Sequence, residues 1–271
     1  MSIIALIGPP GSGKTTMACL TSVNKPVHVI DIDRKIRSMV SLQGAIKKGE
    51  LTVWELSESL MEDSLGSRMR ALVENKAPSK PPRGWTMFAN YSEKMESIEE
   101  VVKAGTIVLD STTQLSYHMR EHMQFLSNKT RYNWDLWSAW GSMWKELTTA
   151  YIDYCLSTNK DLIMIFHERV GEAPSEDTKK VIVKQSEGGR QREYVGTMDV
   201  KVSAAIDGAY GKEFGTYFTE IYALEVKIEN DKPRWVCRVL PDRKRDLRTS
   251  FDVKGQAEWE PNFGKIWGVS K

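Results

Sequence analysis

Residues 8–15 read Gly8-Pro9-Pro10-Gly11-Ser12-Gly13-Lys14-Thr15, which matches the phosphate-loop pattern G-x-x-x-x-G-K-[ST]. The apolar run at 3–7, Ile-Ile-Ala-Leu-Ile, precedes the loop and has the length and β-branching of a buried strand. The run at 16–20, Thr-Met-Ala-Cys-Leu, follows it and predicts the opening of a helix. Because this motif is meaningful only between a strand and a helix, the setting predicts a site for a nucleoside triphosphate.

The residue types of this loop suit a magnesium-bound triphosphate. Glycines let successive backbone N–H groups turn toward a phosphate. The Lys14 ammonium is expected to reach the β- and γ-phosphates, and the Thr15 hydroxyl is expected to ligate Mg²⁺. The residues predicted to bind the nucleotide are therefore Gly8, Pro9, Pro10, Gly11, Ser12, Gly13, Lys14, Thr15 and Thr16.

Composition bounds the class of protein. The chain has 271 residues, 41% of them hydrophobic, so it can build one large α/β domain or two small ones. Its formal charge of +2 neither indicates nor excludes a nucleic-acid partner. Cys19, Cys155 and Cys237 form no disulfide or zinc pattern, and no apolar run approaches the ~20 residues that span a bilayer. The first strand begins almost at Met1, leaving no room for a signal peptide, so we expect a cytoplasmic protein without membrane contact.

Strands alternate with helices along the chain. Apolar runs predict strands at 27–33, 51–56, 106–110 and 161–168, whereas helical patterns occupy 92–103, 114–126 and 137–154. Loops are expected at 76–84 and 127–133, a polar, charged segment at 170–196, and an antiparallel hairpin at 219–228 and 234–240. The pattern predicts an α/β fold with a mostly parallel sheet, helices on both faces and a C-terminal antiparallel hairpin. We expect a core at 1–250 and a tail at 251–271, which the pattern does not place.

Two further sequence signals are better explained without a binding function. Trp137, Trp140 and Trp144 recur at helical spacing, so core packing is favoured over a base-stacking platform, with Trp134 as the exception at the loop edge. The string His118-x-x-Glu121-His122 matches a zinc pattern but lacks an evident third ligand, which disfavours zinc.

Acids at strand ends are the candidates for the remaining chemistry. Asp110 ends the strand 106–110 and is expected to hold the Mg²⁺ shell, from the end of a strand neighbouring the loop; the alternative is that it merely caps the next helix. Asp31 and Asp33 end the strand 27–33 on the same edge, and we choose Asp33 to activate water. Glu168 ends another strand there and is expected to sense the γ-phosphate.

These strand motifs, in this order and spacing, resemble the core of RecA-like recombinases. Over roughly residues 1–250 the chain is similar to short phage ATPases that reduce this core to one domain and promote single-strand annealing. The resemblance implies ATP and Mg²⁺ as cofactors and catalytic roles for Lys14, Asp33 and Glu168. Asp33 stands where the family carries Glu, and Glu168 where it usually carries Gln. No segment like the family's subunit-linking element precedes Ile3, which disfavours a RecA-type filament, although the resemblance still implies a homo-oligomer, either a ring or a filament.

The resemblance also implies DNA contacts and a residue that acts in trans. Family DNA loops correspond to 127–133 and 170–196, where the basic candidates are Lys129, Arg131, Lys179, Lys180, Lys184, Arg190 and Arg192. A solvated mixed-charge loop is the alternative for both segments. Lys244 or Arg245 is the candidate that reaches a neighbouring subunit's γ-phosphate.

Three functions stay open. The first is an ATP-dependent recombination protein that binds single-stranded DNA, with a single-strand DNA-binding protein as a further partner, in the host cytoplasm if phage-encoded. The second is a nucleoside or nucleotide kinase, with Arg190 and Arg192 in a lid over the transferred phosphoryl group. The third is an ATP-binding adaptor such as a helicase loader.

Overall fold

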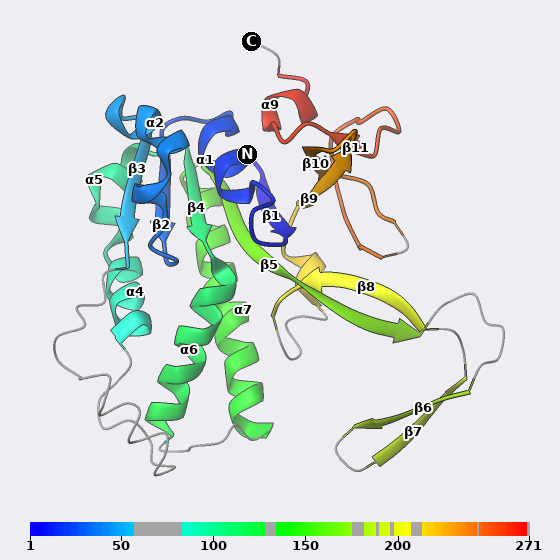
Figure 1. Ribbon diagram of the computed structural model, residues 1–271. Helices are drawn as coiled ribbons and strands as arrows, with labels where there is room; N and C mark the ends of the chain where they lie inside the picture. Colours follow the sequence, from blue (N-terminus) through cyan, green and yellow to red (C-terminus); the bar gives the residue numbers. More distant parts are fainter. Residues whose placement is uncertain are drawn as a thin grey trace.

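The computed structural model describes residues 1–56, 83–127, 134–174, 182–187, 190–195, 198–206, 213–242 and 244–269, with the backbone alone at 134 and 171–201. Within these ranges, nine strands form one sheet at the centre of the molecule (Figure 1), with the path β11-β10-β9-β1-β5-β4-β2-β3 and with β8 paired to β5. The strands of this sheet are β1 (Ile3–Gly8), β2 (Val27–Asp31), β3 (Leu51–Glu55), β4 (Thr106–Asp110), β5 (Asp161–Pro174), β8 (Met198–Ala204), β9 (Glu220–Glu229), β10 (Lys232–Arg238) and β11 (Glu258–Trp259). A separate two-stranded sheet pairs β6 (Ile182–Glu187) with β7 (Arg190–Val195).

The expected strand directions are confirmed. The six strands β9, β1, β5, β4, β2 and β3 pair in parallel, whereas β10 and β11 add antiparallel strands at the C-terminal end of the chain. Parallel strands place their carboxyl ends at one edge, so the ends of β1, β2 and β4 and the end of the parallel part of β5, at His167, come together there.

Helices cover both faces of the sheet, as expected. They are α1 (Lys14–Thr21), α2 (Gln43–Lys47), α4 (Arg83–Glu93), α5 (Glu99–Lys103), α6 (Thr112–Leu126), α7 (Trp134–Ser157) and α9 (Phe263–Ile266), with short 3₁₀ turns at 36–38, 40–42, 95–97 and 214–216. Alternation along β1 divides the core, because Ile3 packs with the cluster under α4–α7 and Ile4 with the cluster under α1, α2 and α9. Trp140 and Trp144 of α7 are buried in the first cluster, which confirms core packing for the tryptophan stripe. None of the helices within the described residues is long and apolar enough to cross a membrane.

Some expected boundaries are wrong, for physical reasons. The second strand ends at Asp31, two residues early, because the N–H groups of Ile32 and Asp33 both donate to the carbonyl of Asp110. The helix expected at 92–103 is divided, since Met95 and Val101 are both buried although six residues place them on different faces of one helix.

Two expected loops are also revised. Gly84 lies within α4, whereas 76–82 fall outside the described residues. The segment 170–196 contains the end of β5 and the strands β6 and β7, with two residues between those two strands. Two runs separated by two glycines are typical of a hairpin, a signal that the mixed charges obscured.

The tail at 251–271 contributes to the described core. Its strand β11 pairs with β10, and α9 packs near α1. The Phe263 N–H donates to the Thr21 hydroxyl at the end of α1, 3.1 Å away, and the Phe263 ring is completely buried.

Phe263→Ala should therefore destabilise the fold. We expect the free energy of unfolding to fall by about 3–5 kcal/mol, because the truncation leaves a cavity beside α1. Urea denaturation followed by circular dichroism measures this change. Leu156→Ala, at a half-exposed apolar residue of α7, is the control and should cost under about 1 kcal/mol. Equal losses in the two variants would contradict a structural role for the tail.

Candidate nucleotide-binding site

The loop between β1 and α1 is shaped by two glycines. Gly13 precedes α1 with φ of 88°, a left-handed conformation that glycine adopts without strain. A Cβ on Gly8 would collide with the carbonyl oxygen of Leu224 on the adjacent strand β9. The Gly13 cap offers no side-chain acceptor to the first N–H groups of α1, so these groups can bind an anion.

The Lys14 ammonium lies inside this loop. It donates hydrogen bonds to the carbonyl oxygens of Gly8 at 2.6 Å and Pro9 at 2.7 Å. Burial lowers the pKa of Lys14 to about 8, although the nearby Asp110 carboxylate opposes this shift. The cation is thus held by the backbone that the predicted phosphates would face.

Thr15 joins the loop to Asp110. Its hydroxyl donates to Asp110 Oδ2 at 2.6 Å, which brings together the two residues predicted to hold Mg²⁺. We expected Asp110 at the end of a strand beside β1, and this expectation is wrong. Its strand, β4, is separated from β1 by β5. The contact therefore reaches across one strand, through the start of α1.

The environment of Asp110 contradicts the capping alternative. The Ser111 hydroxyl, not Asp110, accepts the Gln114 N–H at the start of α6. Asp110 is completely buried, and burial raises its pKa against the opposing charge of Lys35 and the hydrogen bond from Thr15. A buried carboxylate in this position requires cationic or donor partners.

The oxygen atoms of Thr15 and Asp110 fit Mg²⁺. The ion prefers hard oxygen ligands, and in nucleotide sites it takes one or two from the protein and others from phosphates and water. Within the described ranges no three His, Cys, Asp or Glu side chains gather into a metal-binding cluster. Thr15 and Asp110 are thus the residues that would hold Mg²⁺, Asp110 through water.

Asp33 and Asp31 occupy different environments. Asp33 accepts hydrogen bonds from the Ser111 hydroxyl at 2.9 Å and the Lys35 ammonium at 2.8 Å. Burial alone would raise the pKa of Asp33, but these two partners lower it, so the carboxylate stays ionised. Asp31 is completely buried, accepts the Ile36 N–H at 2.7 Å, and has its pKa raised to about 6 by burial. Asp31 therefore supports the turn after β2, whereas Asp33 faces the site.

Lys35 is a site residue that sequence reasoning missed. Its ammonium lies 2.8 Å from Asp33 Oδ2 and 3.2 Å from Asp110 Oδ1, so it bridges the two carboxylates. The carboxylates of Asp110 and Asp33 raise the pKa of Lys35 although burial opposes them. No motif marks this position, because a lysine just beyond a strand is usually solvated.

The middle of β5, where its parallel pairing with β1 ends, contributes His167 and Glu168. His167 pairs with Gly8 in register, and its Nε2 lies 3.9 Å from Asp33 Oδ2. Burial and the Lys14 charge lower the pKa of His167. Glu168 is partly exposed and close enough to Lys14 for its charge to raise the Lys14 pKa. The structure thus brings the predicted residues Lys14, Asp33, Asp110 and Glu168 to one edge.

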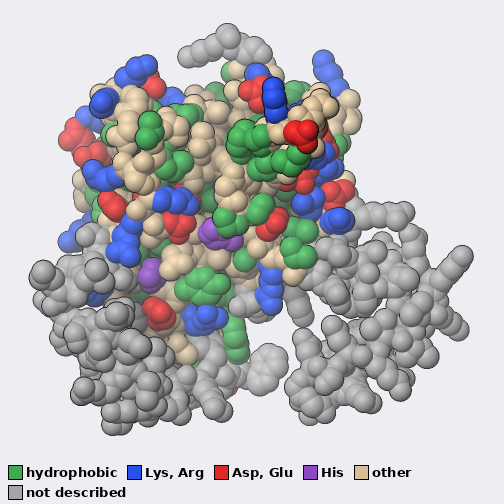
Figure 2. Space-filling model, viewed as in Figure 1, with side chains coloured by type: hydrophobic (Ala, Val, Ile, Leu, Met, Phe, Trp, Pro, Cys, Tyr) green, Lys and Arg blue, Asp and Glu red, His purple; other side chains and the backbone are tan. Residues whose placement is uncertain are grey.

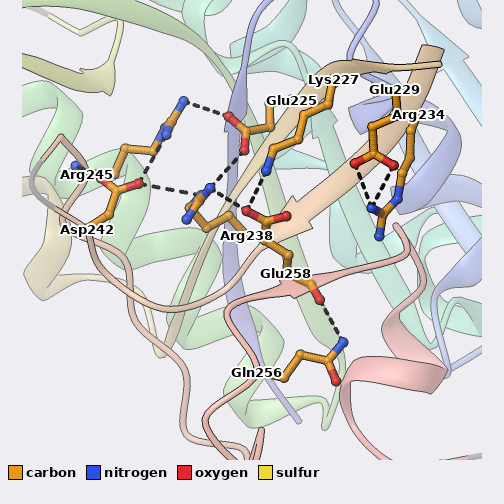
Figure 3. Close-up of polar contacts among 9 residues, drawn as sticks. All are labelled: Glu225, Lys227, Glu229, Arg234, Arg238, Asp242, Arg245, Gln256 and Glu258. Carbon is orange, nitrogen blue, oxygen red and sulfur yellow. Dashed lines mark hydrogen bonds and ion pairs between the residues drawn. The ribbon is translucent and has the colours of Figure 1, made fainter. Parts of the chain in front are cut away.

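Arg245 is held within its own subunit (Figure 3). Its guanidinium pairs with Glu225 at 3.1 Å and Asp242 at 3.3 Å, and the side chain is only 14% exposed. Arg238 pairs with the same two acids. In the isolated subunit this network holds Arg245, whereas the neighbouring Lys244 is exposed; both residues stay predictions for a group that acts in trans.

The predicted DNA-binding residues lie mostly beyond the described part of the chain. Lys129, Arg131, Lys179 and Lys180 fall outside it, whereas Lys184 lies on β6, and Arg190 and Arg192 lie on β7, where only the backbone is described.

Trp235 of β10 is a second residue that sequence reasoning missed. Its indole N–H donates to the Gly11 carbonyl at 3.2 Å, and a Cβ on Gly13 would lie 3.5 Å from its ring. Trp235 therefore packs on the phosphate loop from the C-terminal hairpin. A signal existed in the alternation of β10, but only the sheet order places that strand beside the loop.

Trp235→Phe should weaken nucleotide binding, because it removes the hydrogen bond that steadies the Gly11 carbonyl. We expect an affinity loss of about three- to tenfold. Equilibrium titration with a fluorescent ATP analogue measures the affinity. The matched control is Trp259→Phe, which also loses an indole bond to a backbone carbonyl, that of Gln256, but on β11. Equal effects of the two substitutions would contradict a loop-specific role.

Asp31→Asn should flatten the pH dependence of stability. In the parent, the buried carboxyl stays protonated to about pH 6, whereas in the unfolded chain it ionises near its usual pKa of 3.8. The parent thus loses stability as the pH rises from about 4 to about 6, and the variant does not. We expect the variant's free energy of unfolding to gain on the order of 2 kcal/mol relative to the parent across this range.

Urea denaturation at a series of pH values measures the Asp31 effect. Asp153→Asn changes an exposed carboxyl of α7 and serves as the control, which should leave the parent profile unchanged. Parallel profiles for Asp31→Asn and the parent would show that Asp31 is ionised at low pH in the folded protein.

Comparison with known proteins identifies the family. Residues 2–223 match the model of a family described as "AAA domain". Among solved structures, the chain is similar to the KaiC-like protein PH0186 of Pyrococcus horikoshii OT3, with 10% identity, a TM-score of 0.42, and coverage of 93% of this chain and 82% of that one. It is also similar to the flagellar accessory protein FlaH of Methanocaldococcus jannaschii, with 13% identity, a TM-score of 0.37, and coverage of 88% and 76%.

A search of curated proteins found no match. The family match covers the phosphate loop and all the site residues on β2, β4 and β5, and it confirms the expected P-loop NTPase fold class. This chain belongs to the AAA domain family of P-loop NTPases.

Proposed function

We propose that this protein is a Mg²⁺-dependent ATPase that binds single-stranded DNA and promotes strand annealing in recombination. The observation that carries the proposal is the course of β5. The first half of this strand lies between β1 and β4 and reaches the phosphate loop at Glu168. The strand then continues without interruption to Pro174. From Glu168 onward it pairs with β8 and leads into the mixed-charge segment 170–196, which carries five Lys and Arg residues among as many acids. One strand thus connects the nucleotide site with the segment proposed to bind DNA.

The site residues support hydrolysis by positioning and charge. Lys14 would release the loop carbonyls and pair with the β- and γ-phosphates. Mg²⁺, when bound at Thr15 and Asp110, supplies charge that stabilises the transferring phosphoryl group. Asp33, which its partners keep ionised, would accept a proton from the attacking water.

Glu168 would report the state of the phosphate. The Glu168 charge already attracts the Lys14 ammonium. A change in the position of Lys14 would therefore alter the electrostatic force on Glu168, where the parallel part of β5 ends. The outer half of β5 is a regular antiparallel ladder with β8, running from Glu168–Ala204 to Pro174–Met198. A shift at Glu168 can therefore be transmitted along the strand as a rigid element.

The DNA contact is proposed for the segments 127–133 and 170–196. On the face drawn in Figure 2, Lys and Arg side chains of the described residues are interspersed with Asp and Glu. Because DNA phosphates are neutralised by Lys and Arg side chains, we assign phosphate binding to the basic residues of these two segments, Lys129, Arg131, Lys179, Lys180, Lys184, Arg190 and Arg192. This assignment follows the resemblance to annealing ATPases.

Assembly completes the proposal. Lys244 is exposed at the end of the ion-pair network and would reach the γ-phosphate bound by a neighbouring copy in a ring or filament. A single-strand DNA-binding protein is the expected further partner, because it covers the strands that an annealing protein must reach. The proposed location is the cytoplasm, of the host if a phage encodes the chain.

Phosphate release tests the coupling. We expect the rate to rise when single-stranded DNA is added, and the increase to fall as salt rises from about 50 to about 200 mM, because DNA phosphates must be neutralised. Lys14→Ala should lower the rate by about 10²-fold or more, since it removes the charge that stabilises the phosphoryl group. Lys47→Ala, at an exposed lysine of α2, is the matched control and should retain the parent rate.

Other outcomes point to the other functions. A rate that DNA leaves unchanged in low salt, together with a phosphorylated small-molecule acceptor, would contradict the proposal and support a kinase. Slow turnover with capture of a replicative helicase and no annealing would instead support an adaptor.

A further inference from the structure

Lys35 lies at the centre of the nucleotide site, yet the proposed chemistry does not use it. Its ammonium bridges Asp33 Oδ2 at 2.8 Å and Asp110 Oδ1 at 3.2 Å. The second oxygen of Asp110 accepts the hydroxyl of Thr15. Lys35 and Thr15 thus hold the two oxygens of one buried carboxylate, the carboxylate expected to serve Mg²⁺.

The backbone around Lys35 is built to keep it there. The Ile32 and Asp33 N–H groups donate to the carbonyl of Asp110, which ties the end of β2 to the end of β4. The Asp31 carboxylate accepts the Ile36 N–H on the other side of the turn. Between them, Arg34 has a left-handed φ of 55°, a conformation that disfavours residues with a Cβ. These restraints return the chain so that Lys35 meets the two acids.

The bridge competes electrostatically with a divalent ion. A cation that approaches Asp110 would meet the ammonium of Lys35 within ion-pair distance of the same carboxylate. Like charges at this distance repel, and the buried position of Asp110 strengthens the repulsion. The ammonium would therefore weaken the attraction of Asp110 for the ion, and Lys35 has a second carboxylate partner, Asp33, when the ion binds.

We propose that Lys35 is a resident counter-cation of this site, which competes with Mg²⁺ for Asp110 and so sets the Mg²⁺ concentration needed for nucleotide binding. The inference rests on the proposed function only for the binding of a magnesium nucleotide. It requires neither hydrolysis nor DNA. Lys35 also supplies a positive charge near the phosphates when Mg²⁺ is scarce.

The test is a Mg²⁺ titration of fluorescent ADP binding. Lys35→Met removes the charge and keeps an unbranched side chain. We expect the half-maximal Mg²⁺ concentration to fall about fivefold, which corresponds to the ~1 kcal/mol of a half-exposed ion pair. In EDTA the same variant should bind ADP more weakly than the parent, because the phosphates then face Asp33 and Asp110 without a counter-charge.

Three further variants make the result specific. Lys35→Arg keeps the charge and should keep the parent midpoint more closely than Lys35→Met does. Lys35→Gln keeps a hydrogen-bond donor without the charge, and it repeats the test if the methionine variant does not fold. Lys47→Met changes an exposed lysine of α2 and should change neither measurement.

The outcomes separate this inference from the proposed function. A parent that binds ADP equally well with and without Mg²⁺ contradicts both. If the parent depends on Mg²⁺ but the midpoint is unchanged or higher in the uncharged variants, Lys35 does not compete with the ion and only the inference is overturned. A lower Mg²⁺ midpoint in Lys35→Met and Lys35→Gln, together with a parent-like midpoint in Lys35→Arg, supports the inference.

Discussion

The burial of negative charge at one edge of the parallel sheet is the constraint on which the site depends. Asp31 and Asp110 are both completely buried, and Asp33 is partly buried. Donor groups hold each of them in place. A backbone N–H donates to Asp31 and the Thr15 hydroxyl to Asp110, and the ammonium of Lys35 pairs with both Asp110 and Asp33. A buried carboxylate without such partners would be costly. The loop, the turn after β2 and the start of α1 are consequently bound to one another.

The sheet order gives this cluster its connections. Because β5 lies between β1 and β4, the loop and Asp110 are separated by the strand that carries Glu168. That strand continues beyond its parallel partners, to Pro174. On the other side of β1, β9 approaches Gly8 closely and β10 carries Trp235 over the loop. The phosphate loop therefore contacts both an outgoing strand and the C-terminal hairpin.

Much of the fold could be predicted, because its signals are local. The loop motif, the apolar runs of β1, β2, β4 and β5, and the alternation of the hairpin are properties of short segments. Predictions failed where a distant contact decided the outcome. The carbonyl of Asp110 ends β2 early, and the shared core divides the helix expected at 92–103. The ion pairs of Arg245 with Glu225 and Asp242 also depend on packing that the sequence pattern does not show.

The sequence by itself determined that a triphosphate loop opens an α/β domain and that acids follow its parallel strands. The motif dictates local backbone geometry, and parallel strands share an edge whatever their order. Only the tertiary structure decided that β5 separates β1 from β4, that Lys35 bridges Asp33 and Asp110, and that Trp235 covers the loop. These facts depend on strand order and on the path of a turn, because contacts between residues far apart in the chain arise from packing and leave no periodic trace in the sequence.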